Sequence, residues 1–131
     1  MDYNLFKVNQ VSSTNTYLQD ILKANPGLEE TVVVAEYQTD GRGQGSNAWE
    51  SRPGENILMS WLIYPEFLSV SGQFQLSKIV SLAICDYLSS YTGNIFIKWP
   101  NDILAGTRKI AGILIENSVI QDTICLLYTS P

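Results

Sequence analysis

Residues 98–102, KWPND, place an ammonium group and a carboxylate four positions apart. The Trp-Pro step between Lys98 and Asp102 is stiff, because proline fixes its own φ and pushes the preceding residue into an extended conformation. Taken alone, such a pair is typical of a surface ion pair worth under about 1 kcal/mol. Lys109 adds a third charge in the mostly apolar stretch RKIAGILIE. Together these side chains could stabilise negative charge on a bound phosphate or carboxylate.

A second candidate for anion binding is the segment QTDGRGQGSNAWES at residues 38–51, in which Gly41, Gly43 and Gly45 alternate and flank Arg42. Glycine loses more conformational freedom on folding than any other residue, so this density predicts left-handed backbone angles or close approach to a ligand. Neither a phosphate-binding P-loop nor a dinucleotide fingerprint fits, since both lead into a helix. An anion would be held by loop amides and Arg42, whereas the simpler alternative is a surface turn.

A third candidate is VSSTN at residues 11–15, a run of small hydroxyl and amide side chains that precedes a helical pattern. Capping of the helix accounts for one or two of these residues. The remainder could line a pocket that reads the edge of a polar heterocycle.

The elements that must position these groups follow from hydrophobic periodicity. We expect strands at 5–11, 31–38, 56–65 and 94–100, and two more within 101–116 joined by a turn at 105–107. Helices are expected from 12–14 to 25–27 and at 73–91. Strands joined by short turns, with only two helices, indicate an α+β fold with a mixed, largely antiparallel sheet and helices on one side.

Composition limits the classes of function. The chain has 131 residues, about one domain, with 45% hydrophobic residues and a net charge of −5. Eight scattered Lys and Arg argue against a nucleic-acid partner. Two cysteines and no histidine argue against a zinc site or a histidine-dependent catalytic dyad. With no signal-like leader and no apolar run of about eighteen residues, we expect a cytoplasmic protein without a membrane partner.

The joint order of these segments resembles the catalytic domain of the biotin protein ligases. STN, a strand ending in YQ, GRG with a tryptophan beyond it, KWPND and RKIAGIL follow one another between Val11 and Glu116. The resemblance implies a fold of the class II aminoacyl-tRNA synthetase and biotin ligase type. It also implies activation of biotin with ATP and Mg²⁺ to biotinyl-5′-AMP. Transfer to a lysine of a biotin carboxyl carrier domain, part of a biotin-dependent carboxylase, would follow; a homodimer is also allowed.

The resemblance assigns roles by motif position. It implies catalytic roles for Lys98, Arg42, Asp102 and Lys109, with Asp102 placing Mg²⁺ or Lys109. The residues implied to bind biotin are Ser13, Thr14, Asn15, Gln38, Gly41, Arg42, Gly43, Gln44, Lys98 and Gly112. Those implied to contact ATP or the adenylate are Arg42, Trp49, Asn101 and Lys109.

Two departures from the family pattern matter. Many members carry a second arginine where this chain has Gln44, followed here by Gly45 and Ser46. A neutral amide cannot match a charge-assisted contact to phosphate, so we expect the adenylate to be held less tightly. In addition, we expect residues 1–124 to be a partial catalytic domain without a winged-helix or SH3-like domain.

The end of the chain is expected to differ from the native protein. CLLYTSP at residues 125–131 does not resemble the family's strand and does resemble a translated sequencing adapter. Three functions therefore stay open: an active biotin ligase, an incomplete fragment with at most weak ligand binding, and a lipoate or octanoate ligase of the same fold. The biotin-like KWPND and RKIAGIL motifs favour the first over the third.

Overall fold

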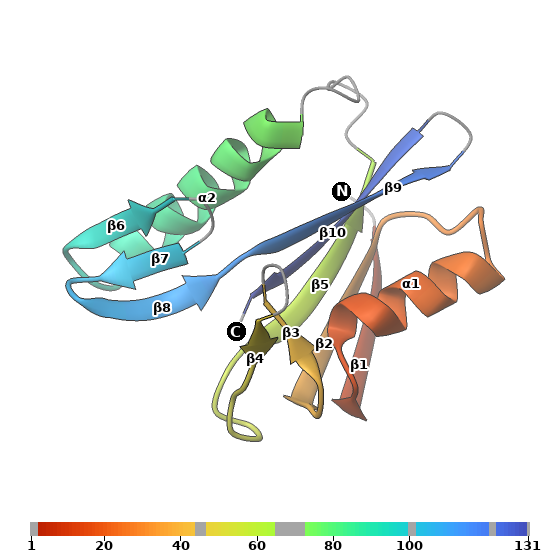
Figure 1. The fold of residues 1–131 in the computed structure, drawn as a ribbon, viewed down its shortest axis with the longest axis horizontal. Helices are drawn as coiled ribbons and strands as arrows, with labels where there is room; N and C mark the ends of the chain where they lie inside the picture. The colour runs from red at the N-terminus through yellow and green to blue at the C-terminus, as the bar shows by residue number, and fades with distance from the viewer. Residues whose placement is uncertain (1–2, 44–46, 65–72, 100–101, 121–122, 131) are drawn as a thin grey trace. The chain divides into compact units, whose positions relative to one another are not determined.

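The computed structural model describes residues 3–43, 47–64, 73–99, 102–120 and 123–130. These residues belong to two compact units (Figure 1). The first unit is Met1–Glu66 with Leu114–Pro131, and the second unit is Phe67–Ile113. Among the described residues, the first unit has two sheets and one helix, and the second unit has one sheet and one helix.

The first unit contains a five-stranded sheet in the order β1-β2-β5-β10-β9. The strands are β1 (Asn4–Val11), β2 (Thr31–Gln38), β5 (Leu58–Ile63), β9 (Leu114–Ile120) and β10 (Thr123–Ser130). β1 and β2 are parallel, as expected for strands joined through a helix, and the other neighbours are antiparallel. The prediction of a mixed, largely antiparallel sheet is confirmed for this unit.

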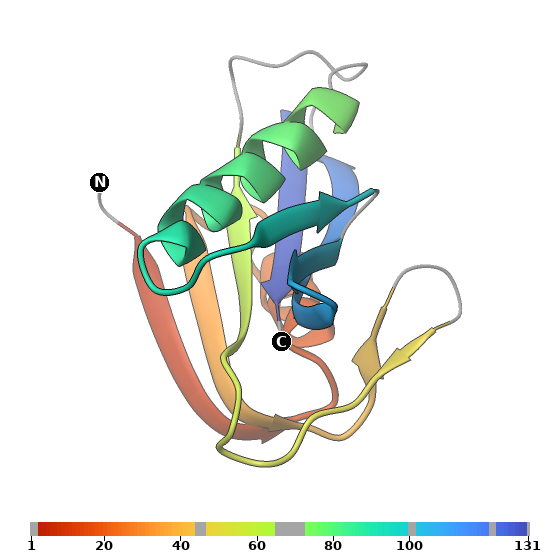
Figure 2. The same cartoon turned by 90° about the vertical axis from the view of Figure 1, so that its left-hand side faces the viewer.

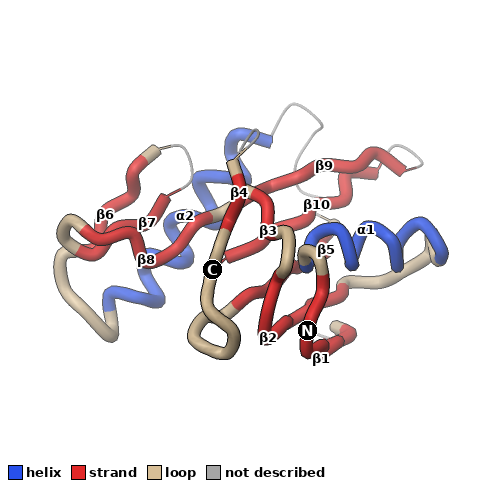
Figure 3. The backbone as a smooth tube through the Cα atoms, turned by 60° about the horizontal axis from the view of Figure 1, so that its bottom comes forward, coloured by secondary structure: helices blue, strands red, loops and turns tan. Residues whose placement is uncertain are grey.

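Helix α1 (Thr14–Ala24) connects β1 to β2 and lies along β5 (Figure 3). The Ser13 hydroxyl caps its start by accepting from the Thr16 N–H at 3.1 Å, and Asn25 ends it. Its apolar stripe buries Leu18 and Leu22 against Val33 and Leu62 of the sheet. This packing fixes the start of α1 over the end of β2, where the polar VSSTN residues lie.

The glycine-rich segment is more ordered than an open loop. Gly41–Arg42 forms strand β3 and Ala48–Trp49 forms strand β4, paired antiparallel with Gly41 opposite Trp49. Figure 2 shows this short ladder, in yellow, set apart from the ends of β1 and β2. Of the two reasons expected for the glycines, left-handed backbone angles are not found at Gly41 or Gly43. The chain beyond the glycines instead folds back and pairs with Gly41 and Arg42.

The second unit packs α2 (Gln73–Ser89) on a three-stranded antiparallel sheet in the order β6-β7-β8. The strands are β6 (Ile95–Lys98), β7 (Asp102–Ala105) and β8 (Arg108–Gly112). Leu76, Ile103 and Ala111 are buried in it. The predicted turn between β7 and β8 is confirmed, and Gly106 takes a positive φ of 61° there, which favours glycine.

Two expectations about the sheets need correction. The strand expected to run to residue 116 ends at Gly112, because its partner β7 begins at Asp102, which pairs with Gly112. From Leu114 the chain pairs with β10 of the first unit instead. The described strands thus form three sheets rather than one, and the two helices pack on the sheets of different units.

Neither α1 nor α2, the helices of the described residues, has the length and apolar character needed to cross a bilayer.

Candidate functional site

A buried polar cluster surrounds the first turn of α1. Ser13, Thr14 and Asn15 are at most 3% exposed, although each carries a polar side chain. Buried hydroxyl and amide groups are costly unless they are hydrogen-bonded. Each member should therefore have an identifiable partner, and the structure supplies one from a different strand for both Thr14 and Asn15.

Gln38, at the end of β2, anchors one side of this cluster. Its side-chain Oε1 accepts from the Thr14 N–H at 2.8 Å and contacts the Thr14 hydroxyl at 3.1 Å. Since Oε1 is committed to Thr14, the amide orientation is fixed and Nε2 faces the other way. Nε2 has no acceptor among the described residues and remains available as a hydrogen-bond donor.

Ser60 on β5 anchors the floor of the cluster. It is fully buried between Leu58 and Leu62, at an inward-facing position of the strand. Its hydroxyl lies 2.6 Å from the Thr14 hydroxyl and also donates to the Asn15 side-chain oxygen. A serine at an inward position of an apolar strand was a readable signal in the sequence, and it was missed.

Glu116 on β9 closes the cluster from the opposite side. Its Oε1 accepts from Asn15 Nδ2 at 2.8 Å, and its Oε2 accepts from Arg42 Nη1 at 2.7 Å. Arg42 also donates through Nη2 to the Thr16 hydroxyl at 3.2 Å. The sequence offered no signal for this residue, because Glu116 is 101 positions from Asn15 and 74 from Arg42.

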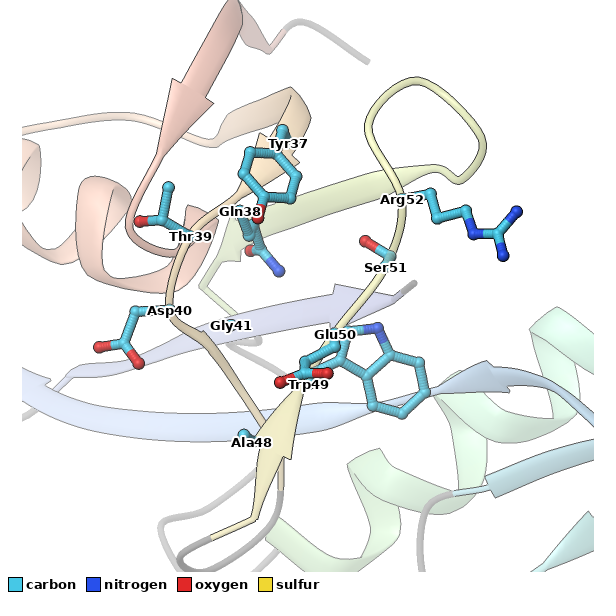
Figure 4. Close-up of a pocket in the computed structure, with 10 residues that line it drawn as sticks. All are labelled: Tyr37, Gln38, Thr39, Asp40, Gly41, Ala48, Trp49, Glu50, Ser51 and Arg52. Carbon is cyan, nitrogen blue, oxygen red and sulfur yellow. The ribbon is translucent and has the colours of Figure 1, made fainter.

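A cavity of about 500 Å³ opens between the end of β2 and the β3–β4 ladder. In Figure 4 the Gln38 amide reaches in between the chain segments that bear Asp40 and Ser51, while the Arg52 guanidinium extends away. This volume is typical of small-molecule sites. Its lining residues are Tyr37, Gln38, Thr39, Asp40, Gly41, Ala48, Trp49, Glu50, Ser51 and Arg52.

Position 41 has no room for a side chain, because Trp49 and Gln38 approach it closely. A Cβ at this position would lie 2.4 Å from the Trp49 carbonyl oxygen and 2.8 Å from Gln38 Nε2. Gly43 is less crowded, with the nearest atom of Asn47 at 3.3 Å. The requirement for glycine at position 41 therefore comes from the strand partner and from the Gln38 amide that faces the cavity.

In the second unit, strand register gathers the other candidate residues on one face of the sheet. Lys98 is directly opposite Asp102, and Asp102 is directly opposite Gly112. Residues directly opposite one another in an antiparallel pair have their Cβ atoms about 4.5–5.5 Å apart on the same face. The strand pair thus places Lys98 and Asp102 of KWPND opposite each other on the same face.

A register shift between Ile103 and Leu104 brings Lys109 to the same face. Ile103 is opposite Ala111, but Leu104 is opposite Lys109, so Ile110 is the extra residue of the irregularity. Without that shift Lys109 would be opposite Ala105 and would point to the other face, because side chains alternate along a strand. Bulges of this kind commonly re-aim a side chain.

The consequence is an ion pair, with Lys109 Nζ 2.8 Å from Asp102 Oδ1. Both side chains remain partly exposed, 39% for Lys109 and 24% for Asp102. The other Asp102 carboxylate oxygen, Oδ2, takes no part in that ion pair. Mg²⁺ typically binds one or two carboxylates together with substrate phosphates, so this single oxygen fits a cation that arrives with a nucleotide. The described residues contain no group of three or more acidic, cysteine or histidine ligands that could hold a metal alone.

The structure therefore brings the sequence-predicted residues together in two groups. In the first unit, Ser13, Thr14, Asn15, Gln38 and Arg42 share one hydrogen-bond network, with Trp49 and Gly41 lining the adjacent cavity. In the second unit, Lys98, Asp102, Lys109 and Gly112 share one sheet face. Gln44 and Asn101 lie outside the described residues.

Comparison with known proteins places the chain among related enzymes. Residues 7–127 match the model of the Biotin/lipoate A/B protein ligase family. The Bifunctional ligase/repressor BirA of Bacillus spizizenii is 34% identical over 125 residues, which are 95% of this chain and 38% of that protein. The chain thus spans well under half the length of this relative.

Solved structures agree in fold. The biotin protein ligase from Leishmania major in complex with biotin has a TM-score of 0.78 and 27% identity, covering 96% of this chain and 55% of that one. The biotin protein ligase from Aquifex aeolicus in complex with biotin and ATP has a TM-score of 0.72 and 30% identity, covering 96% and 51%. The predicted α+β fold of the biotin ligase type is confirmed. From the family match over residues 7–127, the chain belongs to the Biotin/lipoate A/B protein ligase family.

Proposed function

We propose that the chain supplies part of a biotin protein ligase that makes biotinyl-5′-AMP from biotin and ATP, then passes the biotinyl group to a lysine of a carrier domain. The observation that carries this proposal is the buried cluster at the start of α1. It holds Gln38 Nε2, a donor with no acceptor among the described residues, at a cavity of about 500 Å³. Such a site suits a ligand with a ring C=O and N–H groups.

In the first half-reaction, a biotin carboxylate oxygen attacks the α-phosphorus of ATP and pyrophosphate leaves. Two anions must meet, so nearby cations lower the barrier. We assign contact with the carboxylate to Lys98 and contact with the phosphate to Arg42 and Lys109. Mg²⁺ would accompany the nucleotide and stabilise the pyrophosphate charge, with Asp102 offering one oxygen.

The remaining assignments follow the two groups of residues. We assign binding of the ureido ring to the buried cluster and binding of the adenylate to Trp49 and Asn101. The glycine-rich segment would cover the bound ligand. Gly112, buried opposite Asp102, would let the ligand approach the sheet closely. In the second half-reaction a carrier lysine amine attacks the mixed-anhydride carbonyl and AMP leaves.

Relatives that bind biotin and ATP support this proposal, since the Aquifex aeolicus ligase was solved with both. A lipoate or octanoate ligase is the alternative within the family. A fatty acyl chain or dithiolane ring has no urea group, so it would offer Gln38 Nε2 no acceptor. That mismatch favours biotin.

The test is ATP-dependent labelling of a biotin carboxyl carrier domain by the purified chain, with biotin and lipoate in competition. Labelling with biotin that excess lipoate does not suppress supports the proposal. Labelling with lipoate alone would replace biotin by the alternative. Saturable biotin binding without labelling would identify an incomplete fragment. Gel filtration in the same assay reports whether a homodimer forms.

Three finer expectations belong to the same proposal. We propose that residues 1–124 are part of a catalytic domain that acts in the cytoplasm, where ATP and carboxylases are available. The non-native origin of residues 125–131 stays a prediction, which resequencing the locus tests. For Gln44, replacement by arginine should slow release of biotinyl-AMP, and an unchanged release rate would reject that idea.

A further inference from the structure

Glu116 connects two sets of candidate ligand groups without belonging to either. It lies on β9, while Asn15 lies in the first turn of α1 and Arg42 ends β3. One carboxylate oxygen accepts a hydrogen bond from the Asn15 amide at 2.8 Å, and the other accepts one from the Arg42 guanidinium at 2.7 Å. Three segments that are distant in sequence therefore meet on a single side chain.

The charge of Glu116 fixes the orientation of the Asn15 amide. An ionised carboxylate only accepts hydrogen bonds, so the Asn15 NH₂ group must face it. The Asn15 oxygen then faces Ser60, whose hydroxyl donates to it. A neutral glutamine at position 116 could donate as well as accept, so it could pair with either orientation of the Asn15 amide.

The same carboxylate fixes the Arg42 guanidinium. Nη1 donates to Glu116 and Nη2 donates to Thr16, so the planar group is held from two directions. Its Nε is buried without an acceptor among the described residues. With side chains 37% and 26% exposed, Arg42 and Glu116 stay close enough to solvent for a ligand anion to reach the remaining donors.

We propose that Glu116 is a positioning residue that couples the buried polar cluster at the first turn of α1 to Arg42. This inference rests on the proposed function, in which Asn15 serves the ring of biotin and Arg42 serves the phosphate of the adenylate. Glu116 touches neither part of the ligand. Its removal therefore weakens both recognition steps together, whereas loss of Asn15 or Arg42 weakens mainly one.

The test compares Glu116→Gln with Glu116→Asp in the whole chain. The first variant keeps nearly the same shape and loses the charge; the second keeps the charge with a shorter reach. Glu55→Gln is the matched control, because Glu55 is exposed and lies outside the cluster and the cavity lining. Two measurements are made on each: the affinity for biotin by calorimetry, and the release rate of biotinyl-AMP.

We expect Glu116→Gln to lower the affinity for biotin about tenfold and to raise the release rate of biotinyl-AMP about tenfold, the order expected when a hydrogen bond to a charged group is lost. Glu116→Asp should recover part of both losses, and Glu55→Gln should match the parent. The inference is overturned if Glu116→Gln matches the parent in both, if only one measurement changes, or if the aspartate variant is no better than the glutamine variant.

A third measurement separates this inference from the proposed function. NMR of the Asn15 side-chain amide and the Arg42 Nε–H in the ligand-free chain reports the surroundings of the two groups that Glu116 contacts. Both signals should shift in Glu116→Gln and not in Glu55→Gln, whether or not the chain makes an adenylate. Unchanged signals contradict the inference, while a chain that shifts as expected but forms no adenylate contradicts the proposed function only.

Discussion

The two units hold their candidate ligand groups in different ways. In the first unit, Thr14, Asn15 and Ser60 are at most 2% exposed and satisfy one another. In the second unit, Lys98 is exposed, and Lys109 and Asp102 form a partly exposed ion pair on an open sheet face. The first arrangement is buried and neutral apart from Glu116 and Arg42, whereas the second is charged and partly exposed to solvent.

Under the proposed function, the buried groups of the first unit recognise the ligand, and the exposed cations of the second unit stabilise its negative charge. Buried groups that are already hydrogen-bonded contribute to folding, and replacing one leaves its partners unsatisfied. Exposed charges contribute little to stability, because solvent screens them. Substitutions in the first unit should therefore reduce stability and ligand affinity together, while substitutions in the second unit should reduce the rate alone.

The largest expected effect is that of Lys98→Ala on the rate. Loss of a cation that stabilises transition-state charge should slow biotinyl-AMP formation by about 100-fold or more, measured in a single turnover. The melting temperature should stay near that of the parent. Lys78→Ala, at an exposed lysine of α2, serves as the control. A normal rate in Lys98→Ala would remove this residue from the chemistry.

Gly41→Ala should have the next largest effect, this time on stability. The new Cβ would lie 2.4 Å from the Trp49 carbonyl oxygen, so the β3–β4 ladder must shift. Overpacking of this kind costs about 1–3 kcal/mol in the free energy of unfolding. Gly93→Ala is the matched control, because nothing lies within 4 Å of its added Cβ. Equal denaturant midpoints for the two variants would show that the close approach is unimportant.

Ser60→Ala should lower stability by a similar or smaller amount. The change removes the hydroxyl that donates to the Asn15 side-chain oxygen and one of the contacts of the Thr14 hydroxyl, which costs about 1–2 kcal/mol. Biotin affinity should fall in parallel, as measured by calorimetry beside urea unfolding. Ser12→Ala, at an exposed position just before the cluster, should change neither quantity. A stable Ser60→Ala variant with normal affinity would break the proposed link between the cluster and recognition.

Asp102→Asn should have the smallest effect on stability. It removes the ion pair with Lys109, whose members are both partly exposed, so the cost in unfolding free energy should stay below about 1 kcal/mol. Adenylate formation should nevertheless slow, because Lys109 loses the carboxylate that orients it. A large drop in stability with an unchanged rate would reverse the contrast between the two units.

Local patterns in the sequence predicted much of this arrangement. Periodicity predicted both helices, and the cap at Ser13 follows from hydroxyl residues before an apolar stripe. The boundary predicted between two strands at KWPND separates Lys98 on β6 from Asp102 on β7. These features depend on neighbours within a few residues, for which propensity and pattern are informative.

Features that depend on distant pairing could not be predicted. The shift that turns Lys109 toward Asp102 depends on how β7 and β8 register, which no residue type specifies. The β3–β4 ladder depends on Trp49 returning to Gly41. Glu116 joins the cluster only because β9 lies in the same sheet as β5, through β10. Such contacts are set by tertiary packing rather than by local sequence.

Biotin-dependent exchange of pyrophosphate into ATP tests the central claim most directly, because it reports adenylate formation without a carrier protein. We expect the chain to catalyse saturable exchange that requires biotin and Mg²⁺ and is lost in Lys98→Ala. Exchange that is supported by lipoate but not by biotin, or that continues unchanged in Lys98→Ala, would contradict the assignment of these residues to biotin activation.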